Sequence, residues 1–597
     1  MKALKYTILS ILLGGAVSSC NFLDKEPGKL VIDNYFNTPE EANSFLTGVY
    51  AALGQSTFYG ADYLYLVGGD DLEHYGGTNR SPNSTGLICN NATSSDAAVT
   101  GFWYTLYSGI NRANIFLENI DRVSKIDAKL KAQYTAEARF LRAFYYFNLV
   151  QCWGDVPFRT SSTSDVVGLD APRVDKQKIY DFIVSEMDEI SNETTGGLLT
   201  AAELNYQPGR ISKSAAWGIL ARVYLFRAGE FHREGRAANA DETKTYYEQA
   251  AKYAKKVVEL GKHTLAKDYW DFFIDLCADR YNSTATESIW EIEFAGNNTS
   301  DVKAEGRIGN IIGLAAPDMS SKSTVTGSAD PGFGYEFIFA TPKLYKLYGT
   351  DINAPELADP ADEAAKALRE KDARYYWNIA PFKYVEDGGK NTGVTGREFY
   401  EQAGLDYVLA NDKGRSYSYG SKDVLTTAKQ VDYARACSKF RREYEADKKD
   451  KNSTAINFPA LRYSDVLLML AEAENEVNNG PTADAEAALY AVRERAGLKE
   501  ALPKMSKGQF LKAVKDERAR ELCFEYTRHF DLIRWGELVS SMNPLAEEAT
   551  NGVNSGWKQG PVNVHNYFRI SEAYNYFPIP EAEMAVNKAI TQNNPGW

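Results

Sequence analysis

The densest set of residues that could do chemistry lies near the end of the chain, in Glu517–Trp535, ERARELCFEYTRHFDLIRW. It holds four acids and four arginines: Glu517, Glu521, Glu525, Asp531, Arg518, Arg520, Arg528 and Arg534. Carboxylates one helical turn apart could serve as an acid and a base. However, each has an arginine within reach that keeps it ionised, and an unpaired buried ion costs several kcal/mol. The stretch therefore predicts a paired ion network that locks the last helices onto the body, among the buried side chains of Phe524, Phe530, Ile533 and Trp535.

The chain lacks the fingerprints of common catalytic and cofactor sites. None of its five histidines lies within metal-ligand spacing of another; they are His74, His232, His263, His529 and His565. Gly306, Gly309 and Gly313 do not form a dinucleotide-binding fingerprint, and neither a phosphate-loop lysine motif nor a nucleophile elbow occurs. We therefore expect no catalytic residue, no metal ligands and no cofactor.

One pair of acids leaves two other chemistries open. Glycoside hydrolysis needs only two carboxylates, roughly 5–9.5 Å apart, and Asp70–Asp71 is the candidate pair. Adjacent loop residues rarely point at the same bond, so hydrogen bonding to a ligand suits them as well. A structural calcium ion is a further alternative, because its oxygen ligands can come from separate loops, although the regular calcium-loop spacing is absent.

The positive signal is the abundance of aromatic residues, with 38 Tyr, 28 Phe and 9 Trp. Sugar rings present apolar C–H faces that lie flat on aromatic rings, and their hydroxyl groups need polar partners at the rim. The aperiodic segment Gln55–Thr100 offers both. We predict a carbohydrate site formed by Tyr59, Tyr63, Tyr65, Asp70, Asp71, Tyr75, Asn79, Arg80, Tyr335 and Phe337. The alternative is that these tyrosines are core residues, as we expect for Trp103, Tyr104 and Tyr145 on helical faces.

The elements that must position these residues are mostly helices. Thr38–Glu41 is a capping box that opens a helix to about Leu53, and Ser506–Gln509 is a second one. Helical patterns also cover Phe102–Ile120, Lys131–Gln151, Lys176–Ser191 with Asp175 as N-cap, Ile211–Gly229, Thr245–Leu260, Arg462–Asn478 and Thr482–Ala496. Paired helices with alanines at the points of approach resemble tetratricopeptide repeats of about 34 residues. The predicted fold class is mainly α: a tetratricopeptide-like helical-hairpin solenoid with long loop insertions and a few short β-strands.

Function is expected in the segments that interrupt these helices, because stacked repeats use their consensus residues for packing. The insertions are Gln55–Thr100, Thr264–Tyr335 and Asn378–Gln430. Ser288–Phe294, SIWEIEF, alternates like a short strand, and Tyr567–Ile570 is a second candidate strand.

The N-terminus has the pattern of a secretory signal. Lys2 and Lys5 precede an apolar run that ends in Val17-Ser18-Ser19-Cys20. Small residues before a cysteine suit a lipoprotein signal peptidase, so residues 1–19 are predicted to be a signal peptide and Cys20 an acylated N-terminus. Residues 20–30 would be a lipidated tether. A transmembrane anchor is disfavoured, because the run is short for a bilayer core of about 30 Å.

The net charge limits the classes of binding partner, and the cysteine spacing limits the possible disulfides. Removal of the signal reduces 67 basic residues to 65 against 80 acidic ones, a net charge of −15, which argues against nucleic acid. The five remaining cysteines are scattered, and we interpret them as mostly buried small hydrophobes, with one disulfide left open. They are Cys89, Cys152, Cys277, Cys437 and Cys523.

Several segments resemble one known family. They are Glu517–Leu538, Leu461–Glu476 (LRYSDVLLMLAEAENE) and Tyr576–Trp597 (YFPIPEAEMAVNKAITQNNPGW), together with AEARFLRAFYYFNLVQCWGDVPF in the first half. They are similar to the SusD/RagB family of cell-surface glycan-binding lipoproteins, which serve nutrient uptake in Gram-negative bacteria. The resemblance runs in order from about Cys20 to Trp597.

This resemblance implies one SusD-like domain over residues 31–597, with helical repeats and binding loops to about residue 350 and a SusD/RagB part over 351–597. It implies a lipid anchor in the outer membrane, on the cell exterior, and a SusC-like TonB-dependent transporter as the partner that receives the bound oligosaccharide. It also favours the loop site, because family members bind glycan on loops of this kind.

Three functions compete at this point. A glycan-binding uptake lipoprotein, which is not an enzyme, is the preferred hypothesis. A surface glycoside hydrolase that uses Asp70 and Asp71 is the second. A scaffold whose helical grooves bind only protein is the third.

Overall fold

The computed structural model describes residues 36–76, 86–163, 170–284, 286–294, 306–316, 331–353, 362–386, 394–411, 424–425, 435–445, 451–550 and 566–597. In this part of the chain helices dominate and strands are short, which confirms the predicted fold class. Buried apolar residues from Phe36 to Ile590 form one large core cluster. A smaller cluster packs around Phe382 and Phe399.

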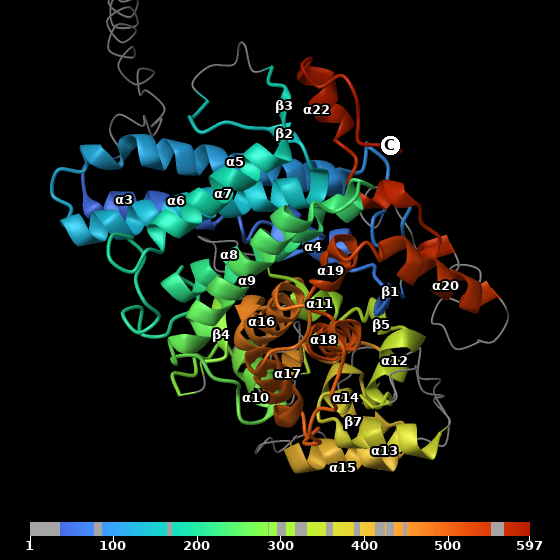
Figure 1. Cartoon of the computed structure of the whole chain (residues 1–597). Coiled ribbons are helices and arrows are strands. Elements are labelled where there is room, and N and C mark those ends of the chain that lie inside the picture. Colours follow the sequence, from blue (N-terminus) through green and yellow to red (C-terminus); the bar gives the residue numbers. More distant parts are fainter. Residues whose placement is uncertain are drawn as a thin grey trace, which may run out of the picture.

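The first half of the chain is an array of long antiparallel helices (Figure 1). They are α3 Pro39–Tyr50, α5 Ala97–Asn119, α6 Ala128–Trp153, α7 Lys176–Ile190, α8 Lys213–Arg233 and α9 Ala240–Glu259. Consecutive helices pack as hairpins, α5 on α6, α6 on α7 and α8 on α9. The predicted capping box at Thr38 and Glu41 is present, and Asp175 caps α7 by accepting a hydrogen bond from the Gln177 backbone N–H.

The C-terminal helices continue this array. They are α16 Tyr463–Val477, α17 Ala483–Arg495, α18 Lys507–Leu522, α19 Arg528–Arg534, α20 Leu538–Thr550 and α22 Glu581–Val586. Helix α16 packs on α9 and α8, and α19 packs on α8. The close approach of α19 needs Gly229 on α8, because a Cβ there would lie 2.0 Å from the Arg534 carbonyl oxygen. The second predicted capping box, Ser506 with Gln509, opens α18.

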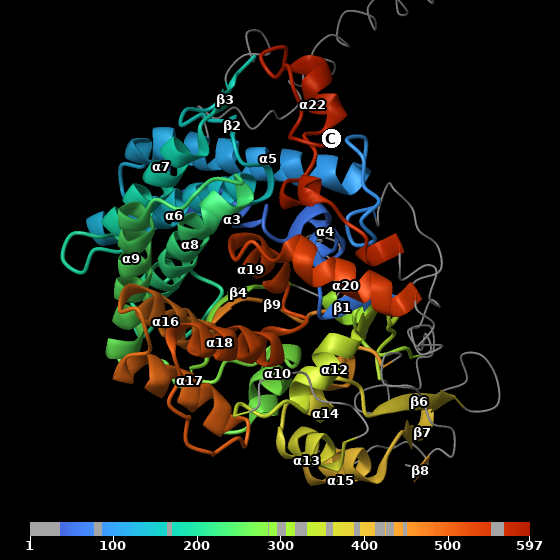
Figure 2. The same ribbon diagram turned by 45° about the vertical axis from the view of Figure 1, so that its right-hand side comes forward.

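Shorter helices occupy the insertions. They are the π-helix Ser56–Gly60, α4 Asp62–Val67, α10 Tyr269–Cys277, α11 Ile308–Ile311, α12 Pro342–Tyr348, α13 Glu363–Lys371, α14 Tyr375–Asn378 and α15 Gln402–Asn411, with 3-10 turns at Ile120–Arg122, Arg442–Tyr444 and Glu572–Asn575. Figure 2 shows α12 to α15 at one end of the molecule, beside the largest sheet. The prediction of an aperiodic loop over Gln55–Thr100 is therefore wrong in part. Its Gly- and Ser-rich composition hid α4, whose apolar stripe of Tyr63, Leu64 and Val67 is buried.

The strands of the described residues form four small sheets. Their members are β1 Glu73–Tyr75 with β5 Ile338–Ala340, β2 Val156–Pro157 with β3 Arg173–Val174, β4 Ser288–Ile292 with β9 Phe458–Arg462, and β6 Phe382–Glu386 with β7 Val394–Phe399 and β8 Val424–Leu425. Strand β4 confirms the prediction for SIWEIEF. The predicted strand at Tyr567–Ile570 is wrong, because Tyr567 and Phe568 lie in a helical turn.

The predicted ion network is confirmed. Arg462 forms ion pairs with Glu521 at 2.6 Å, Glu525 at 2.7 Å and Glu287 at 2.9 Å, and all four side chains are buried. Arg374 binds Glu517 and Glu521 in the same interior, and Lys439 binds Glu525. Phe524, Phe530, Ile533 and Trp535 are buried around the network, as expected. The charges therefore join α18 to β9, β4 and α14 from within.

The cysteines behave as small hydrophobes. All five described cysteines, the set named above, are buried.

Candidate functional site

Four of the ten predicted binding residues lie together in a line of aromatic rings, called here the aromatic row: Tyr65, Tyr75, Phe337 and Tyr335. The ring centroids are separated by 6.2 Å between Tyr65 and Tyr75 and by 5.5 Å between Tyr75 and Phe337. Phe337 and Tyr335 stack at 4.9 Å with an angle of only 10° between their planes. Tyr75 is buried, whereas the other three rings are half-buried and keep exposed surface.

Pairing of distant strands assembles this row. Strand β1 pairs antiparallel with β5, so that Tyr75 lies opposite Ile338, next to Phe337. The Gly76 backbone N–H donates to the Phe337 carbonyl oxygen at 2.6 Å, and the Phe337 N–H donates to the Ile311 carbonyl oxygen of α11 at 3.0 Å. The row is therefore fixed by backbone hydrogen bonds on both sides.

Glu336, the residue between Tyr335 and Phe337 in the sequence, has a strained backbone. Its φ is +56°, in the left-handed region that non-glycine residues rarely adopt. In an extended strand, residues i and i+2 are about 6.6 Å apart along the chain. This separation exceeds the 4.9 Å between the ring centroids of Tyr335 and Phe337. The Glu336 N–H is satisfied by the Gly313 carbonyl oxygen at 3.1 Å. Strain of this kind gathers at binding and catalytic sites, where the surrounding structure holds it in place.

Two charged groups missed by sequence reasoning stand beside the row. The Arg307 guanidinium lies 5.9 Å from the centroid of the Tyr335 ring, and its buried Nε has no hydrogen-bond partner among the described residues. Asp62 lies on α4, and burial, followed by the charge of Asp96, raises its pKa to about 6 while Arg307 lowers it. Arg307 can donate to a ligand hydroxyl and Asp62 can accept from one.

Phe333 extends the row and had a signal in the sequence. Its ring lies 4.8 Å from that of Tyr335, edge to face. Phe333, Tyr335 and Phe337 alternate in the sequence, which places aromatic side chains at every second position. By contrast, neither Arg307 nor Asp62 belongs to a sequence motif. Only the folded structure, which brings them close to the aromatic row, identifies them as candidate binding residues.

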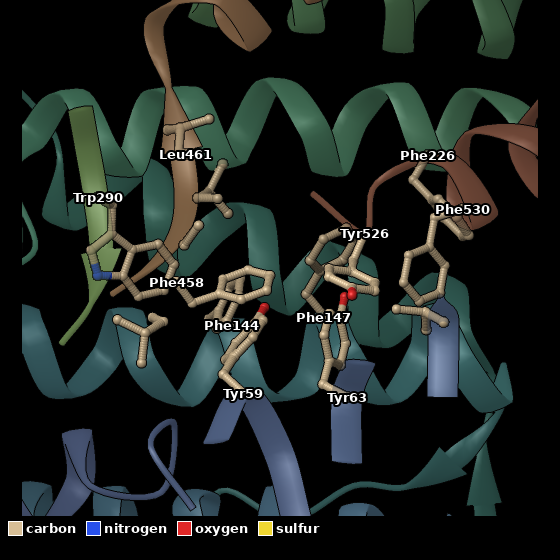
Figure 3. Packing of buried hydrophobic residues seen from close by; sticks show 14 of the residues in the cluster. Tyr59, Tyr63, Phe144, Phe147, Phe226, Trp290, Phe458, Leu461, Tyr526 and Phe530 are labelled. Carbon is tan, nitrogen blue, oxygen red and sulfur yellow. The ribbon is translucent and has the colours of Figure 1, made fainter. Parts of the chain in front are cut away.

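Tyr59 and Tyr63 lie elsewhere, in the core. Both are only 5% exposed. Figure 3 shows them among the buried rings of Phe144, Phe147, Phe458 and Tyr526. The Tyr59 and Phe458 centroids are 4.5 Å apart, and those of Tyr59 and Tyr63 are 4.6 Å apart. A ring packed in this way offers no face to a sugar, so the alternative of core tyrosines holds for these two.

Asp70 and Asp71 also lie inside the protein, with no exposed surface. Asp71 binds Arg528 through both carboxylate oxygens, at 2.7 and 2.9 Å, and also pairs with Lys343. Against the raising effect of burial, these cations hold the pKa of Asp71 below its usual value. Burial and the neighbouring charge of Asp71 raise the pKa of Asp70. Neither carboxylate can reach a glycosidic bond. Asp70 and Asp71 therefore do not belong to the polar rim of the carbohydrate site.

The remaining predictions concern a metal ion and two polar residues. Among the described residues, no group of three or more His, Cys, Asp and Glu side chains lies close enough to hold a metal ion. Asp70 and Asp71 were the alternative calcium ligands. Instead, Asp71 forms ion pairs with Arg528 and Lys343, and Asp70 accepts hydrogen bonds from backbone N–H groups. Asn79 and Arg80 lie outside the described residues.

The arrangement of the row suits carbohydrate. Half-buried rings supply flat apolar faces, and one cation and one carboxylate supply hydrogen bonds at the edge.

Comparison with known proteins gives matches along most of the chain. A model described as the SusD family matches residues 286–597, and one described as starch-binding associating with outer membrane matches residues 21–225. "SusD-like protein P2" of Formosa agariphila is 24% identical, with 100% of both chains covered. The crystal structure of a SusD homologue from Bacteroides thetaiotaomicron superposes with a TM-score of 0.74 at 27% identity, covering 96% of this chain and 100% of that one. Surface glycan-binding protein A of the same species, in complex with laminarihexaose, gives a TM-score of 0.62 at 19% identity and covers 94% and 100%.

Proposed function

This chain belongs to the SusD family, and from that premise we propose that it is a surface lipoprotein that binds a neutral oligosaccharide at the aromatic row. The observation that carries the proposal is the near-parallel stack of Tyr335 and Phe337, held by the strained Glu336 and continued by Tyr75 and Tyr65. Tyr65, Phe337 and Tyr335 keep exposed surface and can contact successive sugar rings, whereas the buried Tyr75 fixes the position of its neighbours.

Binding rather than hydrolysis is the activity. One structural neighbour is named a glycan-binding protein and one matching family is described as starch-binding, which agrees with the prediction that the chain is not an enzyme. The burial of Asp70 and Asp71 removes the carboxylate pair on which the hydrolase hypothesis depended.

The ligand class follows from the chemistry of the row. The ring faces contact C–H groups of any hexose, whereas Arg307 and Asp62 oppose each other in charge and favour a ligand without net charge. A structural neighbour holds laminarihexaose, and one matching family is described as starch-binding. We therefore assign neutral glucan-type chains to this site.

The location at the outer membrane is described for one matching family, and we extend it to a lipid anchor. In this proposal residues 1–19 are a cleaved signal peptide, Cys20 carries the acyl chains, residues 20–30 form the tether and residues 31–597 fold as one domain on the cell exterior. Within the described residues, no helix combines the length and apolar character that crossing a bilayer requires. Acyl chains contribute about 0.8 kcal/mol of membrane affinity per buried methylene group.

The proposed partner is a SusC-like TonB-dependent transporter, to which the chain passes its ligand. Such a role needs only moderate affinity, because a site that must release its ligand gains nothing from slow dissociation.

The test is a binding measurement on the full-length chain in detergent, with a panel of neutral hexasaccharides that includes laminarihexaose and maltohexaose. Tyr335→Ala and Phe337→Ala should each weaken binding about tenfold, the loss expected when a stacking face is removed. Tyr281→Ala is the control, because Tyr281 is an exposed tyrosine outside the row. Equal binding by the unaltered chain and all three variants would exclude the aromatic row as the binding site. Release of shorter saccharides would exclude a pure binding role.

A further inference from the structure

A concave surface lies away from the aromatic row, between α5, α22 and two stretches that follow α6, residues 157–163 and 170–171; we call it the α5–α22 hollow. It encloses about 650 Å³, within the range of roughly 300–1,000 Å³ typical of ligand sites. Figures 1 and 2 both show α22 beside β2 and β3, above α5. The residues that line it include Tyr104, Ser108, Asn111, Arg159, Asp170 and Glu583, and it shares none with the row.

The walls of the hollow are held by hydrogen bonds that do not depend on a ligand. The Tyr107 hydroxyl donates to the Pro157 carbonyl oxygen at 2.8 Å. The Asn114 Nδ2 donates to the Ser161 carbonyl oxygen at 3.0 Å. On the far wall, Asn587 donates to the Ala171 carbonyl oxygen at 3.0 Å and accepts from the Ala171 N–H at 3.1 Å. The hollow is therefore formed in advance, which reduces the entropy that a ligand must lose on binding.

Exposed apolar surface is concentrated here. Among the described residues five large hydrophobic side chains are exposed, and two of them, Tyr104 at 42% and Val586 at 69%, line this hollow, so the prediction of a core position was wrong for Tyr104. The Glu583 carboxylate stands near the Tyr104 hydroxyl: burial, followed by the charge of Glu583, raises the pKa of Tyr104. An aromatic ring that keeps nearly half of its surface in solvent is a platform for an apolar ligand face.

The charges at the rim are mixed. Arg159 brings one cation, and Asp170 and Glu583 bring two carboxylates. The Asp170 Oδ1 accepts from the Lys588 backbone N–H at 2.7 Å, and Asn111 accepts from the Thr163 N–H at 2.8 Å. A phosphate or an acidic sugar would meet two like charges, whereas hydroxyl groups can both donate to the carboxylates and accept from Arg159.

We propose that the α5–α22 hollow is a second carbohydrate site, which takes a neutral saccharide with one ring stacked on Tyr104 and its hydroxyls bonded to Glu583 and Arg159. The ligand class rests on the proposed function, but the location does not. Two separate sites on one chain would hold a long glycan at two points and raise its effective concentration at each.

The test separates the two sites with the same hexasaccharide panel. In full-length protein that carries both Tyr335→Ala and Phe337→Ala, residual saccharide binding should persist. Adding Tyr104→Ala, or Ser108→Trp to fill the hollow one helical turn away, should reduce that residual binding at least about tenfold. Adding Tyr281→Ala should not reduce it, although Tyr281 is 41% exposed and its hydroxyl donates to the Glu293 carboxylate.

Each outcome decides one of the two proposals. Residual binding that disappears only with Tyr104→Ala or Ser108→Trp supports the second site, and a crystal of the double variant soaked with the hexasaccharide should show the sugar on Tyr104. If the double variant binds nothing, or if neither added change has an effect, the hollow is not a site while the aromatic row stands. If the unaltered chain binds no member of the panel, both proposals fall.

Discussion

Asp71 and Arg528, 457 residues apart in sequence, form an ion pair through two parallel hydrogen bonds of 2.7 and 2.9 Å inside the protein. The pair ties the segment before β1 to the start of α19, and so connects the first insertion to the C-terminal helices. Lys343 on α12 joins it from a third part of the chain. A residue predicted to hold a ligand therefore holds the fold together.

The first prediction concerns this pair. Asp71→Asn should lower the free energy of unfolding by about 3–5 kcal/mol, because it leaves the buried Arg528 without its counter-charge. Urea denaturation followed by circular dichroism measures the loss. The exposed pair of Lys512 and Asp516 on α18 is the control, and Asp516→Asn should cost below about 1 kcal/mol. Similar losses in the two variants would contradict the structural role of Asp71.

The neighbouring acid gives a pH-dependent prediction. Burial and the charge of Asp71 raise the pKa of Asp70 from its ordinary value of 3.8 to about 8. A raised pKa in the folded state means that the contribution of Asp70 to stability is fully present below pH 3.8 and is lost as the pH rises through about 8. Asp70→Asn keeps an oxygen for the Leu72 and Glu73 N–H groups and removes this titration.

Asp70→Asn should therefore be more stable than the unaltered chain at pH 9 and should show a flatter fall in stability between pH 5 and pH 9, about the window set by the two pKa values. Melting temperatures across that pH range measure the difference. A variant that loses stability in parallel with the unaltered chain would show that Asp70 is already ionised in the folded protein.

Much of the fold could be predicted, but the site only in part. Helical periodicity and capping boxes are local, so α3, α7 and α18 begin where the sequence indicates. The ion network was also predictable, because buried charges in a short stretch must be paired. The burial of Tyr59 depends on Phe458, some four hundred residues later, and no local pattern reveals that contact. The aromatic row depends in the same way on the pairing of β1 with β5.

A third prediction compares two glycines. At Gly229 on α8 a Cβ would lie 2.0 Å from the Arg534 carbonyl oxygen, whereas at Gly48 on α3 nothing lies within 4 Å. Gly229→Ala should therefore destabilise the protein by at least about 1–3 kcal/mol, because backbone must move. Gly48→Ala should stabilise it by about 0.5–1 kcal/mol, since glycine weakens a helix. Thermal melts of the two variants test both signs, and a stable Gly229→Ala would mean that α8 and α19 are further apart.

The fourth prediction tests whether the strained residue in the aromatic row serves binding. Glu336 has a φ of +56° between two rings stacked at 4.9 Å. Asparagine tolerates this conformation, whereas a β-branched residue strongly resists it. Glu336→Asn and Glu336→Val both remove the carboxylate, so they differ chiefly in backbone preference. Glu336→Asn should bind the hexasaccharides as the unaltered chain does. Glu336→Val should bind them about tenfold more weakly, because an extended backbone separates the rings. Affinity measured by calorimetry decides the matter: if the valine variant binds normally while remaining folded, the stacked geometry is not what the ligand recognises.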